Sequence, residues 1–86
     1  MILSDYRKRL DDIDDQLLRI LNQRAQIVLE VARMKAENNM PYRDYRREEE
    51  LINRAVKRNA GPLLNAHVEG IFDLILEISA AIVESQ

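Results

Sequence analysis

The chain has 86 residues, of which 33% are charged and 47% hydrophobic, a composition typical of one small folded domain. Its 13 basic and 15 acidic residues leave a net charge of −2. This charge argues against nucleic acid as a partner, because proteins that bind nucleic acid usually carry a basic excess. The absence of cysteine excludes thiol catalysis, disulfides and Cys-ligated zinc, and the single histidine, His67, argues against a histidine-based metal site or catalytic triad.

The sequence also argues against a membrane partner. No apolar run reaches the roughly 18–20 residues needed to span a bilayer. The N-terminal Met-Ile-Leu-Ser lacks the basic start of a secretory signal. We therefore expect a cytoplasmic protein.

Two short stretches that combine Asn with Pro divide the chain into three segments. They are Asn38-Asn39-Met40-Pro41 and Asn59-Ala60-Gly61-Pro62, and both residue types are typical of breaks between helices. The segments span about 4–38, 43–59 and 64–85, and none shows strand-like alternation or an internal repeat. The sequence predicts an all-α fold in which three helices form a single domain over residues 1–86.

An apolar heptad pattern runs through the whole first segment. Ser4 is its predicted N-cap, with Asp5 just inside, where a carboxylate favours the positive end of the helix dipole. The two heptad positions hold Leu3, Leu10, Leu17, Arg24 and Val31, and Tyr6, Ile13, Ile20, Ile27 and Met34; Leu18, Leu21 and Val28 widen the stripe. This stripe is broader than a simple two-stranded seam requires.

The length of this first helix predicts a dimer. A helix of about 35 residues is about 50 Å long, whereas a compact monomer of this size has a diameter of about 30 Å. The two shorter helices cannot cover the apolar stripe from one chain. We therefore expect an intertwined homodimer in which two long helices pair and the shorter ones wrap around them.

Arg24 interrupts the heptad, and a guanidinium in a helical core is costly unless an anion pairs with it. It either pairs with a core carboxylate, sets the register of the helices, or binds a ligand. Lys35 follows 11 residues later, almost three turns, so the two cations share a face about 16 Å apart and can grip a small molecule with two acidic groups. Arg7, about 25 Å before Arg24, reaches this pocket only from the partner of an antiparallel helix pair.

The second and third segments show apolar stripes at helical spacing. Asp44 and Asn65 are their expected N-caps. The expected buried residues are Leu51, Ile52, Ala55 and Val56 in the second segment, and Val68, Ile71, Phe72, Ile75, Ile82 and Val83 in the third. Ser79 is the one polar member of the third stripe; its hydroxyl either bonds back to a carbonyl of its own helix or faces a site. His67 is expected at the surface without a role.

Together these residues resemble the all-helical chorismate mutases. The resemblance rests on Leu17-Leu18 through Arg24, on Glu30-Val31-Ala32-Arg33-Met34-Lys35 and on Pro41-Tyr42-Arg43-Asp44 through Glu48, and it covers essentially the whole chain. Its most specific part is the combination of Arg24, Lys35 and the run Arg43-Asp44-xx-Arg47-Glu48. It implies a three-helix protomer in an intertwined homodimer with two active sites. The implied activity is the rearrangement of chorismate to prephenate in aromatic amino-acid biosynthesis, without metal or cofactor.

The resemblance also implies a role for each polar residue. Arg24 would bind one substrate carboxylate and Arg7 of the partner subunit the other, with Arg47 also lining the site. Lys35 would hold the ether oxygen of the breaking bond together with a carboxylate.

The remaining implied contacts concern the substrate ring and the wall of the pocket. Glu48 would accept a hydrogen bond from the ring hydroxyl, and Asp44 would contact the ligand or the pocket wall through the backbone of the helix start. Ser79 matches a small polar residue of the last helix that faces the site.

One position departs from the family pattern. The family usually has Gln or Glu one turn after the Ser79 position as a second donor to the ether oxygen, whereas this chain has Val83. Either the register slips so that protonated Glu84 donates, or Lys35 acts alone, or the site serves a related substrate. Val83 favours, as the nearest alternative, a 4-amino-4-deoxychorismate mutase. An isochorismate pyruvate-lyase on the same scaffold is a further alternative, and a non-catalytic helical dimer or regulatory domain is the alternative from a different class.

Overall fold

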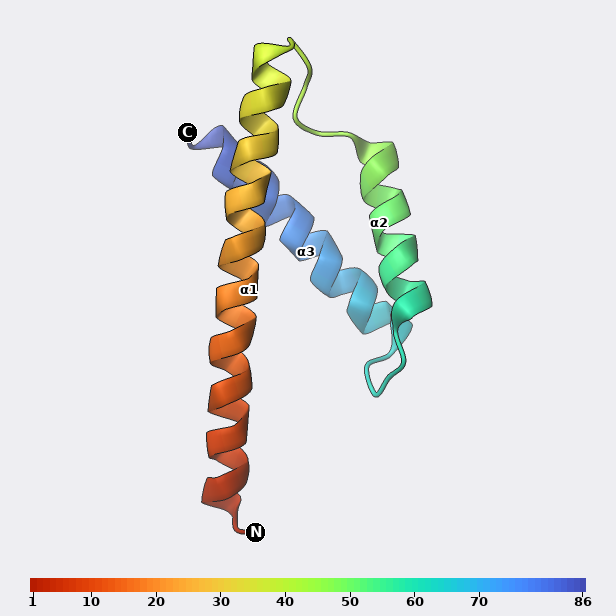
Figure 1. Ribbon diagram of the computed structural model, residues 1–86. Coiled ribbons are helices and arrows are strands. Elements are labelled where there is room, and N and C mark those ends of the chain that lie inside the picture. Colours follow the sequence, from red (N-terminus) through yellow and green to blue (C-terminus); the bar gives the residue numbers. More distant parts are fainter.

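The computed structural model describes residues 1–86 and contains three helices and no strand (Figure 1). The helices are α1 (Leu3–Glu37), α2 (Tyr45–Arg58) and α3 (Asn65–Glu84). The all-α prediction and both predicted breaks are confirmed, and each helix bound lies within two residues of its expected place. None of the three helices combines the length and the apolar character that crossing a membrane requires.

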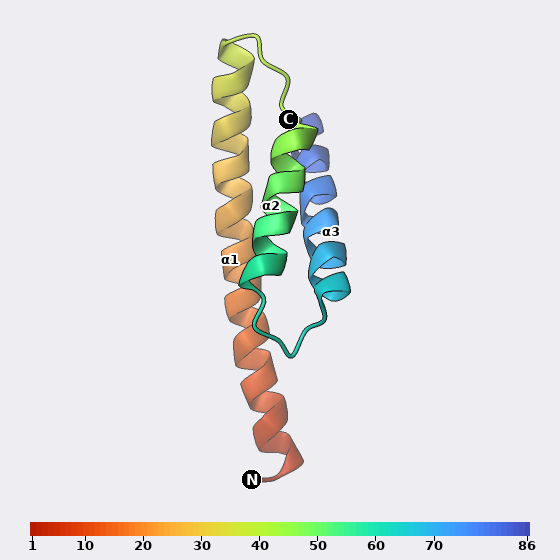
Figure 2. The same cartoon turned by 90° about the vertical axis from the view of Figure 1, so that its right-hand side faces the viewer.

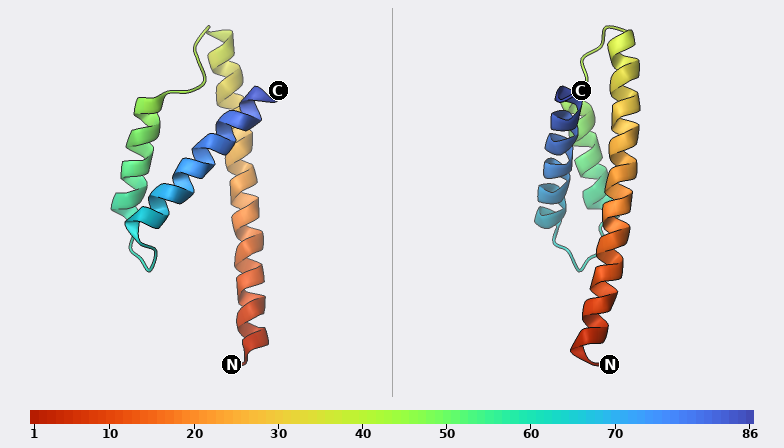
Figure 3. Two further views of the ribbon diagram at one scale, coloured as in Figure 1. Left: turned by 180° about the vertical axis from the view of Figure 1, so that it is seen from behind. Right: turned by 90° about the vertical axis from the view of Figure 1, so that its left-hand side faces the viewer.

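The long α1 dominates the shape of the chain, which measures 55 × 26 × 16 Å. Its 35 residues account for this length at about 1.5 Å per residue. α3 packs against both α1 and α2, whereas α1 and α2 make no close backbone contact with each other. The views of Figures 2 and 3 agree that the N-terminal part of α1 extends beyond the other two helices.

The two ends of α1 are capped by different devices. The prediction of Ser4 as N-cap is wrong: the helix begins at Leu3 after Ile2, because the Asp5 carboxylate itself accepts from the Ile2 backbone N–H at 3.0 Å. At the other end Asn39 adopts the left-handed conformation (φ 55°), and the Met40 N–H bonds to the Lys35 carbonyl at 2.8 Å. This tight end turns the chain toward α2.

α2 begins as the sequence predicts. Asp44 is its N-cap, and its Oδ1 accepts from the Arg47 backbone N–H at 3.1 Å. The turn after α2 is organised by Asn59, whose side chain accepts from the Gly61 N–H at 3.0 Å and donates to the Leu63 carbonyl at 2.7 Å. Gly61 has φ 81°, a value that favours glycine.

The start of α3 corrects two expectations. Leu64, not Asn65, occupies the N-cap position, because the His67 Nδ1 accepts from the Leu64 backbone N–H at 3.2 Å. Asn65 is instead engaged by Asn59, whose amide donates to its Oδ1 at 3.1 Å. His67 therefore has a capping role that the sequence analysis did not give it.

Few side chains are buried within one chain. The buried residues are Val28, Val68, Leu76, Ser79 and Ala80. The expected stripe of α3 is right at Val68 and Ser79 but wrong at Ile71, which is exposed, and it missed Leu76 and Ala80. Because Leu74 and Ile78 are also apolar and exposed, the apolar face of α3 is wider than its buried part, so spacing alone does not identify its inner face.

Candidate active site

A cleft of about 360 Å³ lies between α1 and α2, with α3 contributing to its wall. Its apolar lining comes from Ile27, Val28, Val31, Leu51 and Leu76. Its polar lining comes from Arg24, Lys35, Tyr42, Asp44, Arg47 and Glu48. The structure thus brings together five of the site residues expected from the sequence. The volume of the cleft suits a small-molecule ligand.

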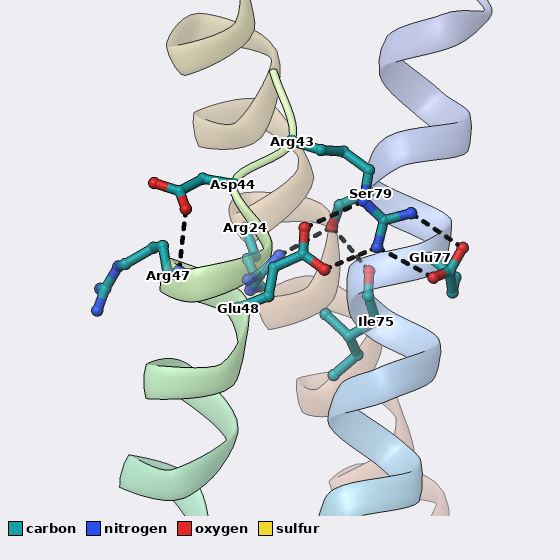
Figure 4. A network of polar contacts seen from close by, with 8 residues as sticks. All are labelled: Arg24, Arg43, Asp44, Arg47, Glu48, Ile75, Glu77 and Ser79. Atoms are coloured by element: carbon teal, nitrogen blue, oxygen red, sulfur yellow. Dashed lines mark hydrogen bonds and ion pairs between the residues drawn. The ribbon is translucent and has the colours of Figure 1, made fainter. Parts of the chain in front are cut away.

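Arg24 is oriented by a neutral partner on α3. Its Nη1 donates to the Ser79 Oγ at 2.9 Å, and the Ser79 hydroxyl donates to the Ile75 carbonyl at 2.8 Å (Figure 4). Ser79 is only 4% exposed and Arg24 is half-buried, so this bond is partly shielded from solvent. No carboxylate pairs with Arg24 within the chain, which rules out the alternative of a core ion pair in one chain and leaves its charge available for an anionic ligand.

Lys35 is held in a similar way at the other end of the cleft. Its ammonium donates to the Tyr42 backbone carbonyl at 2.8 Å and lies 5.5 Å from the centre of the Tyr42 ring. No carboxylate pairs with Lys35 either. The cleft therefore holds two uncompensated cations, about 16 Å apart along α1, above an apolar wall.

The start of α2 places two further charged residues at the cleft. Asp44 caps the helix, and the Arg47 guanidinium lies 3.8 Å from the Glu50 carboxylate. In Figure 4 the Arg47 side chain points away from the Arg43–Glu48 pair. Arg47 is thus a largely exposed cation at the rim, and its weak pair with Glu50 leaves it free to turn toward a ligand.

Glu48 belongs to a charged cluster around Arg43 that the sequence analysis did not anticipate. Arg43 donates to both its oxygens, from Nη2 at 2.7 Å and from Nε at 3.1 Å. The same guanidinium donates to Glu77 of α3 at 3.0 and 3.2 Å. These hydrogen bonds, to Glu48 first and then to Glu77, raise the pKa of Arg43, and the bond from Arg43 lowers the pKa of Glu77.

Four expected site residues do not line the cleft of a single chain. Arg7 is exposed on the projecting part of α1. Val83 is half-buried one turn after Ser79, and Glu84 is exposed at the last position of α3. Ser79 itself reaches the cleft through Arg24.

The arrangement is suited to binding rather than to nucleophilic attack. It offers fixed positive charge, an apolar wall and carboxylate acceptors. The described residues contain no group of three or more side chains suited to hold a metal ion. Such a cleft can restrain a small molecule with two acidic groups and stabilise negative charge that develops within it.

Comparison with known proteins shows which family the chain is similar to. Bifunctional chorismate mutase/prephenate dehydratases from Buchnera aphidicola (strain Sg) and Escherichia coli K12 are each 32% identical to this chain over 78 residues, 90% of its length. The chain spans about a fifth (20%) of the length of these curated relatives.

Solved structures agree along nearly the whole chain. A chorismate mutase from Thermus thermophilus (Form II) superposes with a TM-score of 0.95 and 30% identity, covering 98% of this chain and 96% of the other. Form I of that protein gives a TM-score of 0.88 and 30% identity over 90% of this chain and 96% of the other. The sequence model of the family described as "Chorismate mutase type II" matches residues 6–84. The chain therefore belongs to the chorismate mutase type II family.

Proposed function

We propose that residues 1–86 form one chorismate mutase domain, which rearranges chorismate to prephenate. The observation that carries this proposal is the pair Arg24 and Lys35, two cations on one face of α1 that are held by the neutral groups of Ser79 and Tyr42. Their charges suit the two carboxylates and the ether oxygen of chorismate. Membership of the family and the curated relatives support the same reading.

The proposed reaction needs restraint and charge rather than a nucleophile. In this Claisen rearrangement a C–O bond breaks and a C–C bond forms within one molecule, with no obligatory proton transfer. Holding the flexible dianion in its compact form lowers the entropic part of the barrier. A cation at the ether oxygen stabilises the negative charge that grows there as the C–O bond lengthens.

Each polar residue of the cleft takes a part in this proposal. Arg24 binds a carboxylate through its planar fork, and Lys35 donates to the ether oxygen. Glu48 accepts a hydrogen bond from the ring hydroxyl. Arg47 and Asp44 line the rim, and neither metal nor cofactor is required.

We further propose that the working form is an intertwined homodimer. The large apolar residues of the heptad are exposed in a single chain: Leu10, Ile13, Leu17, Ile20, Ile27 and Met34. Such a long exposed stripe is characteristic of an interface between chains. Pairing along it would carry Arg7 of the partner subunit to the cleft around Arg24, where it would bind the second carboxylate.

Val83 leaves the ether oxygen with fewer donors than the family pattern. One turn after Ser79, its side chain is apolar and half-buried. We propose that Lys35 is the donor to the ether oxygen, with Glu84 as the alternative if α3 shifts in the dimer. The cytoplasmic location stays a prediction.

The test is consumption of chorismate by the purified protein, with the products identified by chromatography. Prephenate formed at an enzymatic rate is the expected result. If chorismate is consumed no faster than in buffer, the proposal is wrong, and 4-amino-4-deoxychorismate and isochorismate are the next substrates to assay. A melting temperature unmoved by all three would favour a non-catalytic dimer, because a ligand bound by the native state raises it.

A further inference from the structure

Arg43 lies beside the cleft, with both edges of its guanidinium occupied (Figure 4). Nε and Nη2 hold the two oxygens of Glu48, while Nη1 and Nη2 hold the two oxygens of Glu77. Four of the five N–H donors of the guanidinium are therefore used. The face of the group lies 4.7 Å from the centre of the Tyr45 ring, which restrains it further.

This cluster joins parts of the chain that are far apart in sequence. Arg43 lies just before α2, and Glu77 lies 34 residues later on α3. The side chains of Arg43 and Glu48 are 23% and 18% exposed, whereas Glu77 is 66% exposed. The Arg43–Glu48 pair is thus partly shielded from water, whereas Glu77 lies at the surface.

We propose that Arg43 and Glu77 are positioning residues that fix the orientation of the Glu48 carboxylate at the cleft. This inference rests on the proposed function, in which Glu48 accepts from the ring hydroxyl of the substrate. A bidentate guanidinium fixes the plane of a carboxylate as well as its place. A glutamate without that partner would sample several rotamers and would lose side-chain entropy on binding substrate.

Both oxygens of Glu48 keep acceptor capacity in this arrangement. A carboxylate has about four lone-pair sites, and Arg43 occupies two of them. The remaining sites suit a hydroxyl donor from the substrate. The charge of Arg43 also offsets that of Glu48, which would otherwise repel a dianionic substrate.

Glu77 holds the Arg43 guanidinium in place, and so keeps it bonded to Glu48. Without Glu77, the outer edge of the guanidinium would face water, and the fork could turn away from Glu48. With Glu77 in place, α3 contacts both sides of the cleft. It bonds to Arg24 of α1 through Ser79, and to Arg43, just before α2, through Glu77.

The experiment compares Arg43→Lys and Glu77→Gln with the full native protein in steady-state chorismate kinetics. Lysine keeps the charge of Arg43 but has no planar fork. We expect Arg43→Lys to raise KM about tenfold, the effect of losing one hydrogen bond to a charged group. Glu77→Gln keeps one acceptor, so its KM should rise less, about threefold.

The change is expected in KM more than in kcat. The ring hydroxyl is remote from the breaking C–O bond, so its contact is about equally strong in the ground and transition states. A general loss of folding would lower the active fraction and hence kcat instead. Arg46→Lys is the matched control, because Arg46 is 91% exposed and makes only a 4.0 Å contact with Glu50.

A double-mutant cycle distinguishes positioning from an independent role. In a Glu48→Gln background, Arg43→Lys should cause no further rise in KM. A full rise in that background would overturn the proposal, as would unchanged KM for both single variants. If Arg43→Lys does not fold, the largely exposed Glu77→Gln decides alone. An inactive native protein would overturn the proposed function, and this inference with it.

Discussion

Arg24 and Ser79 lie 55 residues apart in the chain, and the Arg24 Nη1 donates to the Ser79 Oγ at 2.9 Å. The hydroxyl donates its own proton to the Ile75 carbonyl of the preceding turn. This neutral bond orients the guanidinium without cancelling its charge. A carboxylate in place of Ser79 would give the same geometry but would compete with an anionic ligand.

Replacing Arg24 should abolish most of the activity and leave the assembly intact. For Arg24→Ala we expect kcat/KM for chorismate to fall about 100- to 1000-fold, because a charged donor to the substrate is lost. Sedimentation should still report a dimer, since the apolar stripe is unchanged. Turnover near the native value would exclude Arg24 from the site.

Replacing Ser79 should have a smaller effect than replacing Arg24. Ser79→Ala removes the bond that orients Arg24 but leaves its charge, so we expect a loss of about tenfold in kcat/KM. Ser85→Ala is the matched control, because the Ser85 hydroxyl also bonds back to its own helix, at 2.9 Å to Ile82, in an exposed place. Equal effects of the two variants would contradict an orienting role for Ser79.

Mixing two inactive variants should restore activity if the site is shared between chains. In a heterodimer of Arg7→Ala and Arg24→Ala, one site has both arginines and the other has neither. Random pairing of equal amounts should give about a quarter of native activity. Each variant refolded alone serves as the control, and no recovery in the mixture would show that Arg7 does not act across the dimer.

A second donor near the ether oxygen should raise the rate. We expect Val83→Gln to increase kcat for chorismate, because an amide one turn after Ser79 can donate where valine cannot. The measurement is steady-state kinetics beside Glu84→Ala, which should be neutral. No gain from Val83→Gln together with a loss in Glu84→Ala would favour Glu84 as the donor.

The Arg43–Glu77 pair should make stability depend on acid pH. The bond from Arg43 lowers the pKa of Glu77 in the folded state. The pair therefore stabilises the fold above the unfolded pKa, about 4.3 for glutamate, and this contribution disappears as pH falls through the folded value. The melting temperatures of the native protein and Glu77→Gln should differ at pH 7 and converge in acid. A constant difference would contradict this assignment.

The three helices could be predicted from the sequence because local residue patterns determine where each begins and ends. The heptad and the two Asn–Pro breaks predict three helices whose bounds lie within two residues of the observed ones. The N-caps of α1 and α3 were harder to predict than the helices. Ser4 and Asp5 are both able to cap α1, and Asn65 and His67 are both able to cap α3. Which of them does so depends on which side chain meets the free backbone N–H.

Part of the candidate site could also be predicted from local spacing in the sequence. Arg24 and Lys35 share a rigid helix, so their spacing fixes a common face, and both line the cleft. The partners Arg43 and Glu77 belong to a loop and a different helix. Their meeting depends on the path of residues 38–44, which no periodicity in the sequence describes.

Only five residues of the 86 are buried within a single chain, which is a small core for a chain of this length. Ordering each residue costs about 1–2 kcal/mol, and apolar burial returns only about 25 cal/mol per Å². In the proposed homodimer the missing burial comes from the second copy, so folding and association are one bimolecular reaction. Its midpoint and its refolding rate should both rise with protein concentration. Dilution alone should then unfold the protein, and the activity per chain should fall as the protein concentration falls.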